Sequence, residues 1–66
     1  MALQILYENE YGVLIKRIYP NHKEFINEIE NKQINILPYK CKKCFFDDKS
    51  YTFTSVNDVY EHCLSL

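Results

Sequence analysis

The stretch Tyr39-Lys40-Cys41-Lys42-Lys43-Cys44 (YKCKKC) holds two of the three cysteines in this 66-residue chain. Two thiols separated by two residues can hold a metal ion, form a redox disulfide or simply lie in a turn. The distinction matters because a chain this short buries only about 60% of its unfolded surface. A core of that size rarely contributes more than about 3–5 kcal/mol, so we expect a metal or a disulfide to reinforce the fold.

The surroundings of Cys41 and Cys44 favour a metal ion. Both thiolates can reach one tetrahedral Zn²⁺ when they lie on the same β-turn. A thioredoxin-like redox pair would instead begin a helix after a strand, whereas this pair precedes a polar turn and a strand. An iron–sulfur cluster takes four cysteines, and only three are present. The metal-free alternative is a plain turn, with His62 as a surface histidine and Cys63 as a small buried apolar side chain.

A wider pattern surrounds the cysteine pair between residues 39 and 66. Its anchor residues, in order, are Tyr39-x-Cys41-x₂-Cys44 and then Phe53-x₅-Val59-x₂-His62. This arrangement resembles the C2H2 zinc-finger family, in which an aromatic residue and two cysteines on a hairpin precede a helix bearing Phe-x₅-Leu-x₂-His. The hairpin tip between Cys44 and Phe53 is longer here, which costs little chain entropy. In size the chain resembles the small finger proteins that viruses of microbes encode.

The resemblance implies a zinc-stabilised unit. Cys41, Cys44 and His62 would bind Zn²⁺ from the hairpin and the helix. The remaining anchors would form the small apolar core of the unit: Tyr39, Phe53 and Val59. Zinc binding would then be coupled to folding and contribute about 10–16 kcal/mol, which is far more than so small a core can supply.

The fourth ligand is open, because the family's second histidine falls at Leu66, whose side chain binds no metal. Cys63 is the first choice, since a third thiolate is the softest donor. It requires the helix to unwind after His62, because adjacent helical residues point about 100° apart. Asp58 lies one turn before His62 on the same side of the helix. His22, the terminal carboxylate or a water could also complete the shell.

The first 38 residues predict a hairpin followed by a helix. Residues 3–7 (LQILY) and 13–19 (VLIKRIY) are rich in β-branched and aromatic residues, and the segment between them contains the only glycine. Asn21 is a good helix N-cap, with Glu24 three residues later. A core-facing stripe at helical spacing follows, formed by Phe25, Ile26, Ile29 and Gln33.

The second part of the chain repeats this order of elements. The sequence predicts a strand over 34–41 (INILPYKC), a polar turn over 45–50 (FFDDKS), a short strand over 51–54 (YTFT) and a helix over 55–66. Pro38 favours an edge position for the strand, and Ser55 can cap the helix with Asp58 as its third residue. The chain is therefore predicted to be a small α+β domain of order β-β-α-β-β-α. A supporting unit (1–38) and a zinc-finger-like ββα unit (39–66) pack as one domain.

The composition indicates a folded binding protein. Hydrophobic residues make up 47% of the chain, with six tyrosines and four phenylalanines, which argues against disorder. No nucleophile–base pair or glycine-rich phosphate loop indicates an enzyme, and so small a core leaves no room for a small-molecule substrate. No apolar run approaches the roughly 20 residues that span a membrane, and the N-terminus does not match a signal peptide. The odd cysteine count favours an intracellular protein, cytoplasmic or nuclear.

Two kinds of partner remain open for a regulatory module of this kind. If docking resembles that of the family, the helix over 55–66 enters the major groove of DNA and Asn57 reads adenine. Phosphate contacts would come from the hairpin lysines Lys40, Lys42, Lys43 and Lys49, with Lys16 and Arg17 of the first unit as further candidates. The net charge of −1 gives no general attraction to nucleic acid. The alternative is another protein, bound through the acidic helix and the tyrosines, with a purely structural zinc.

Overall fold

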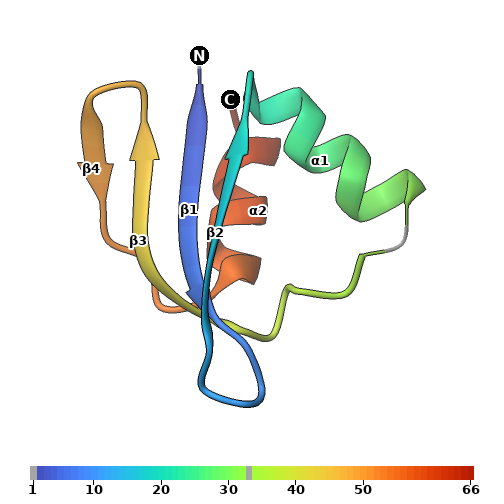
Figure 1. Ribbon diagram of the computed structural model, residues 1–66. Helices are drawn as coiled ribbons and strands as arrows, with labels where there is room; N and C mark the ends of the chain where they lie inside the picture. The colour runs from blue at the N-terminus through green and yellow to red at the C-terminus, as the bar shows by residue number, and fades with distance from the viewer. Residues whose placement is uncertain (1, 33) are drawn as a thin grey trace.

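The computed structural model describes residues 2–32 and 34–66, over which the chain forms a four-stranded antiparallel sheet and two helices (Figure 1). The elements are β1 (Leu3–Glu8), β2 (Leu14–Tyr19), α1 (His22–Asn31), β3 (Lys40–Phe46), β4 (Lys49–Tyr51) and α2 (Val56–Leu64). A small α+β domain, as the sequence predicts, is confirmed. Gln33, which the predicted stripe of the first helix includes, lies outside the described residues.

The sheet has the strand order β2-β1-β3-β4, so that the first strand of the chain lies inside it. Leu3 on β1 pairs with Tyr19 on β2 and with Phe46 on β3. Residues of β1 alternate between buried and half-buried, and Leu3, Ile5 and Tyr7 are the buried ones. Because side chains alternate across a strand, one face of the sheet carries the core and the other is open.

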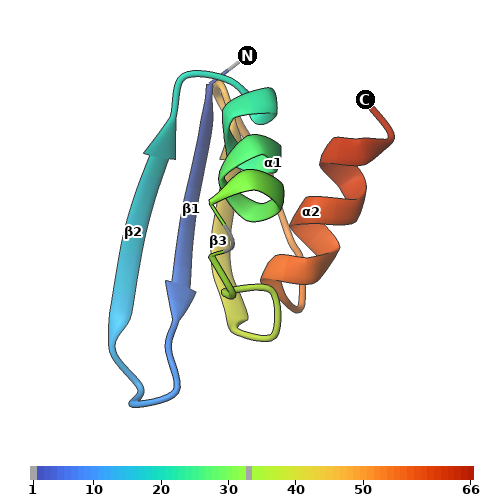
Figure 2. The same cartoon turned by 90° about the vertical axis from the view of Figure 1, so that its right-hand side faces the viewer.

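The helices α1 and α2 lie on the same side of the sheet, as the rotated view shows (Figure 2). Phe25 is the buried residue of α1, and Ile26 and Ile29 pack against the core beside it. The buried residues of α2 are Val56, Val59 and Cys63. The apolar stripe predicted for the first helix and the buried residues of α2 therefore cover one face of the sheet.

Both helix starts follow the predicted capping chemistry. The side chain of Asn21 accepts a hydrogen bond from the backbone N–H of Glu24 at 2.9 Å. The hydroxyl of Ser55 accepts from the N–H of Asp58 at 3.3 Å, while the Asp58 carboxylate accepts from the N–H of Ser55 at 3.4 Å. These bonds satisfy backbone donors that the first turn of a helix leaves without partners, and they fix where α1 and α2 begin.

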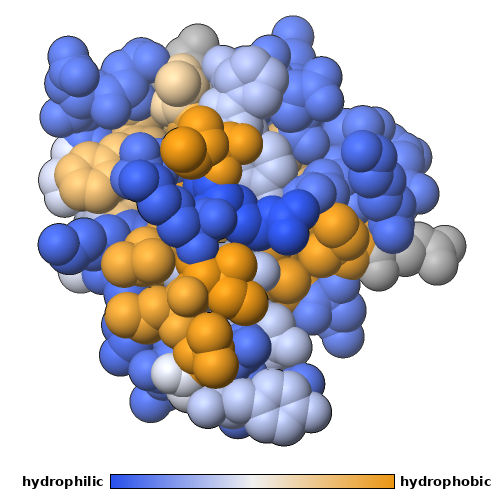
Figure 3. All heavy atoms as spheres, viewed as in Figure 1, coloured by the Kyte–Doolittle hydropathy of each residue, from blue (hydrophilic) through white to orange (hydrophobic). Residues whose placement is uncertain are grey.

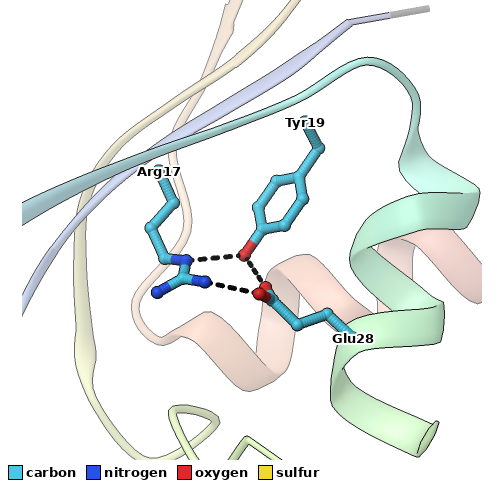
Figure 4. A network of polar contacts seen from close by, with 3 residues as sticks. All are labelled: Arg17, Tyr19 and Glu28. Carbon is cyan, nitrogen blue, oxygen red and sulfur yellow. Dashed lines mark hydrogen bonds and ion pairs between the residues drawn. The ribbon is translucent and has the colours of Figure 1, made fainter. Parts of the chain in front are cut away.

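A polar network joins β2 to α1 (Figure 4). Arg17 donates from Nε to the phenol oxygen of Tyr19 at 3.0 Å and from a terminal nitrogen to the carboxylate of Glu28. The phenol of Tyr19 also donates to Glu28. Burial and this bond to Glu28 raise the pKa of Tyr19, so the phenol keeps its proton and acts as a donor. The network fixes α1 above the edge strand.

The strands predicted around the cysteines are wrong in their bounds. Residues 34–39 form no strand; the N–H of Tyr39 donates to the carbonyl of Ile36, and that of Asn57 donates to the carbonyl of Leu37. Pro38 offers no backbone donor to a sheet, so the chain turns there and β3 begins at Lys40. The polar turn predicted over 45–50 is shorter than expected, because β3 continues to Phe46 and β4 begins at Lys49. Asp47, in the turn between them, has a φ of 55°.

The predicted short strand over 51–54 is likewise displaced. Strand β4 covers Lys49–Tyr51, because Tyr51 pairs with Cys44 and Lys49 with Phe46 on β3. Beyond it, the carbonyl of Thr54 accepts a bond from the N–H of Cys41. In the described part of the chain, neither α1 nor α2 is long and apolar enough to cross a membrane.

Candidate functional site

The cysteine pair lies within β3, and the β-turn predicted for it is wrong. The pairing of β3 with β1 shifts between Leu6, which faces Lys43, and Tyr7, which faces Cys41. Lys42 is the extra residue of this β-bulge. In a regular strand, residues three apart point to opposite faces, but the bulge turns Cys41 and Cys44 to the same face. Both side chains are buried beneath the helices, with exposures of 8% and 0%.

Cys63 joins this pair from α2. It is 1% exposed and belongs to the same core cluster as Cys41 and Cys44. Burial, together with the nearby Cys41 and Cys63 thiols, raises the pKa of Cys44 to about 12. Burial alone raises the pKa of Cys63 to about 11. The thiols are therefore neutral near pH 7, and Cys41 makes a long hydrogen bond of 3.5 Å to the carbonyl of Lys43.

His62 points to a different neighbourhood. Its ring centroid lies 5.2 Å from that of Phe46, 5.3 Å from that of Tyr51 and 5.4 Å from that of Phe53. This aromatic cluster covers the β4 side of the sheet. Tyr39 was expected to pack with Phe53. Its ring stacks instead on that of Tyr7 on β1, with 5.7 Å between the ring centroids.

The other candidate ligands are spread over the molecule. Asp58 lies near enough to Cys41 to raise the pKa of that thiol, after the larger effect of burial. Its carboxylate also caps α2 through Ser55. His22 begins α1, which packs against β2 and α2. The structure therefore brings Cys41, Cys44 and Cys63 into one layer, with Asp58 beside them.

The donor chemistry of this layer suits zinc, which favours thiolates from two elements of a small domain. Within residues 2–32 and 34–66, however, no three His, Cys, Asp or Glu side chains are grouped so as to hold a metal ion. The thiols are neighbours without forming a coordination shell. The zinc site with ligands Cys41, Cys44, His62 and Cys63 stays a prediction.

The predicted nucleic-acid contacts divide between two surfaces. Lys40 and Lys43 lie on the open face of the sheet, since their partners on β1 are Glu8 and Leu6. Lys42 also reaches this face and pairs with Glu8 at 3.9 Å. Asn57 is half-buried in the first turn of α2, on the opposite side of the sheet (Figure 2). Lys49 lies on β4, beside a hollow of about 310 Å³ at the β3–β4 turn.

The open face of the sheet combines apolar and basic side chains. Its apolar residues are Leu14 (54% exposed), Ile18 (65% exposed) and the half-buried Leu6 and Phe45. Lys16 and Lys43 flank Leu6, because both are its register partners. Figure 3 views this face, where apolar residues lie on both sides of a hydrophilic band that crosses the strands. Of the two first-unit candidates for phosphate contact, Lys16 lies on this face, whereas Arg17 bonds Glu28 on the helix side. Sequence reasoning missed the apolar residues around Lys16, although the alternation of β2 could have revealed them.

Among the described residues, charge is divided between the two layers. The strands carry one acid, Glu8, against the basic residues Lys16, Arg17, Lys40, Lys42, Lys43 and Lys49. The helices carry one base, Lys23, against the acids Glu24, Glu28, Glu30, Asp58 and Glu61. The net charge of −1 therefore conceals a positive sheet and a negative helical layer.

No family model matches this chain, and comparison with curated proteins and with solved structures finds no match.

Proposed function

We propose that this chain is a small, non-enzymatic regulatory module that binds nucleic acid through the open face of its sheet. The observation that carries the proposal is the division of charge between the layers. Lys16, Lys40 and Lys43 lie on that face, while the acids of α1 and α2 lie behind it. Phosphates attract lysines irrespective of sequence, and the release of counterions drives such binding.

The geometry favours the sheet over α2 as the contact surface. The resemblance to C2H2 fingers would send the start of α2 into the major groove, but its exposed side is acidic, with Glu61 exposed and Asp58 half-exposed. Those carboxylates would repel phosphates. The sheet instead presents a broad surface with lysines on adjacent strands, and strands lie about 4.8 Å apart.

A single-stranded ligand suits this surface best. Lys16 and Lys43 stand on either side of Leu6, so a phosphate backbone can follow them across three strands. Two apolar side chains lie beside these lysines: Phe45, which is half-buried, and Ile18, which is exposed. Aromatic and apolar side chains between lysines are what unstacked bases contact on sheet surfaces. Phe45 is the aromatic residue placed to stack a base.

A protein partner is the second candidate, and the exposed aliphatic residues favour it. Val13, Leu14 and Ile18 are each more than half exposed on the β1–β2 hairpin. Apolar side chains framed by lysines also suit a protein surface with an apolar centre and an acidic rim. Either partner, together with the free cysteines among the described residues, agrees with an intracellular location, cytoplasmic or nuclear.

The test is a titration of the chain with a fluorescent single-stranded oligonucleotide at several salt concentrations. The double variant Lys16→Glu/Lys43→Glu should bind at least about tenfold more weakly, and the salt slope should fall by about 1.4, since each single-strand contact contributes about 0.7. The control, Lys23→Glu/Lys32→Glu on α1 and its C-cap, changes the net charge equally and should bind like the unmodified chain.

The outcomes separate the candidates. Equal weakening by both double variants would show that only net charge matters and would overturn the assignment to the open face. No binding by the unmodified chain at low salt would reject nucleic acid and leave the protein partner. Circular dichroism of each variant confirms that the fold is retained.

A further inference from the structure

We infer that Cys41, Cys44 and Cys63 are the protein ligands of a soft-metal site, suited to Zn²⁺, and that His62 is not one of them. The inference goes beyond the proposed function, because it concerns the layer between sheet and helices and does not depend on nucleic-acid binding. It differs from the C2H2 resemblance in exchanging the helix histidine for a third thiolate.

The bulge at Lys42 is the first support. Without it, the three-residue spacing would place Cys41 and Cys44 on opposite faces of β3, and one thiol would lie on the open face. With it, both thiols lie on the buried face of β3, in the core cluster that also contains Cys63. Bulges that re-aim a side chain are characteristic of functional positions. A buried strand that needed only apolar packing could fill the face by regular alternation.

The orientation of α2 is the second support. Adjacent residues of a helix point about 100° apart, so Cys63 and His62 cannot both face the pair on β3. The structure resolves the choice in favour of Cys63, which is fully buried in the core cluster with Cys41 and Cys44. His62 packs among the rings of Phe46, Tyr51 and Phe53 instead. No unwinding of α2 is needed for Cys63 to face the other thiols.

The three thiols are not a ready-made shell, since no such group of ligands is assembled in the described residues. The site is therefore one that forms when the metal binds, as is usual for small thiolate domains whose folding and metal binding are coupled. Asp58, which lies beside Cys41, or a water can supply the fourth donor. Three thiolates make the donor set soft enough to select Zn²⁺ over Mg²⁺ or Ca²⁺.

Cobalt is the probe for the ligand set, because Co²⁺ bound by thiolates absorbs in proportion to their number. Under reducing conditions, we expect the chain to bind one Co²⁺, which Zn²⁺ displaces. Cys63→Ser should lower the charge-transfer absorbance by about one third, as one of three thiolates is lost. The affinity for Co²⁺ should fall at least about tenfold, because losing a residue that merely supports a metal ligand already costs about that much. The matched variant His62→Asn should leave both unchanged.

Two results would overturn the inference. If His62→Asn weakens binding as much as Cys63→Ser, the histidine is a ligand and the C2H2 set is restored. If the unmodified chain binds no Co²⁺, the thiols are apolar packing alone. A measurement on the unmodified chain covers the case in which Cys63→Ser fails to fold: Zn²⁺ should slow alkylation of all three cysteines relative to the metal-free chain. Slowing confined to Cys41 and Cys44 would refute the third ligand.

Discussion

The phenol of Tyr19 on β2 donates a hydrogen bond to the carboxylate of Glu28 on α1, so the edge strand and the first helix share a half-buried polar contact. Arg17 donates to both partners. Tyr19→Phe removes the donor but retains the ring, which packs edge-on against Phe25 at 5.3 Å. We expect the free energy of unfolding, measured with urea, to fall by about 1.5–3 kcal/mol, which is the usual contribution of a hydrogen bond to a charged group.

Tyr60→Phe is the control for this prediction. Tyr60 also donates to a glutamate, Glu30, at 2.5 Å, but this bond lies at the surface. Water replaces an exposed partner readily, so little stability should be lost. Equal losses in the two variants would mean that the network around Glu28 contributes no more than a surface contact.

The start of α2 supplies a second prediction. Ser55 and Asp58 exchange hydrogen bonds in a capping box, and Val56, the residue after Ser55, is fully buried. Ser55→Ala should lower the free energy of unfolding by about 1 kcal/mol, because a backbone donor loses its partner. Ser65→Ala at the other end of the helix is the comparison and should cost less, since the Ser65 hydroxyl bonds His62 in an exposed position. A larger effect at Ser65 would contradict the role of the box.

Gly12 allows backbone conformation to be tested apart from packing. Its φ is +77°, and a Cβ built there meets nothing within 4 Å. Gly12→Ala should therefore destabilise only through the left-handed backbone, by about 1–2 kcal/mol in thermal or urea unfolding. Gly12→Asn should cost less, because asparagine adopts this conformation more readily. If alanine were tolerated as well as asparagine, the loop would have to change its conformation.

The buried thiols predict that the protein loses stability in alkali. The pKa of Cys44 rises from 9.0 to about 12 on folding, so between these values the folded state keeps a proton that the unfolded state has lost. Stability conferred by the neutral thiol is full below about pH 9 and declines as the pH rises through this range. In metal-free, reducing buffer, the free energy of unfolding should hold up to about pH 9 and fall as the pH rises from there toward about 12.

The variant Cys44→Ala isolates the contribution of this thiol. Other groups titrate equally in both proteins, so their effects cancel when the two pH profiles are subtracted. The decline should be shallower in the variant, whatever its stability at neutral pH. Parallel profiles would show that Cys44 ionises as easily in the folded protein as in the unfolded chain.

Local signals predicted much of the fold. Asn21 and Ser55 mark the starts of α1 and α2 because capping depends on residues within one turn. The sequence could also predict the hairpin, because β1 and β2 follow each other along the chain and Gly12 marks the turn between them. The prediction of a strand over 34–41 was wrong for residues 34–39. Apolar residues of this segment, such as Ile36, pack on the core without pairing with a neighbouring strand.

The candidate sites depend on pairing that local patterns do not reveal. The bulge at Lys42 exists only relative to β1, so the spacing of Cys41 and Cys44 alone suggested a turn. Similarly, Lys16 and Lys43 are far apart in sequence and meet on one face because both pair with Leu6. The sequence predicts both His62 and Cys63 as ligands, because it does not reveal the rotation of α2 against the sheet, which buries Cys63 beside the other thiols and packs His62 among aromatic rings.

The interior position of β1 also has a consequence for synthesis on the ribosome. Among the six elements of this domain β1 is translated first, yet Leu3 must wait until β3, which carries its partner Phe46, has been translated. The β1–β2 hairpin formed in the meantime is at best marginally stable in water. Its apolar residues therefore stay exposed until β3 and α2 follow, and the nascent chain folds late and as one cooperative unit. Pairing so distant in sequence also slows the search for the native state, which places this small domain among slower folders than a helical bundle of its size.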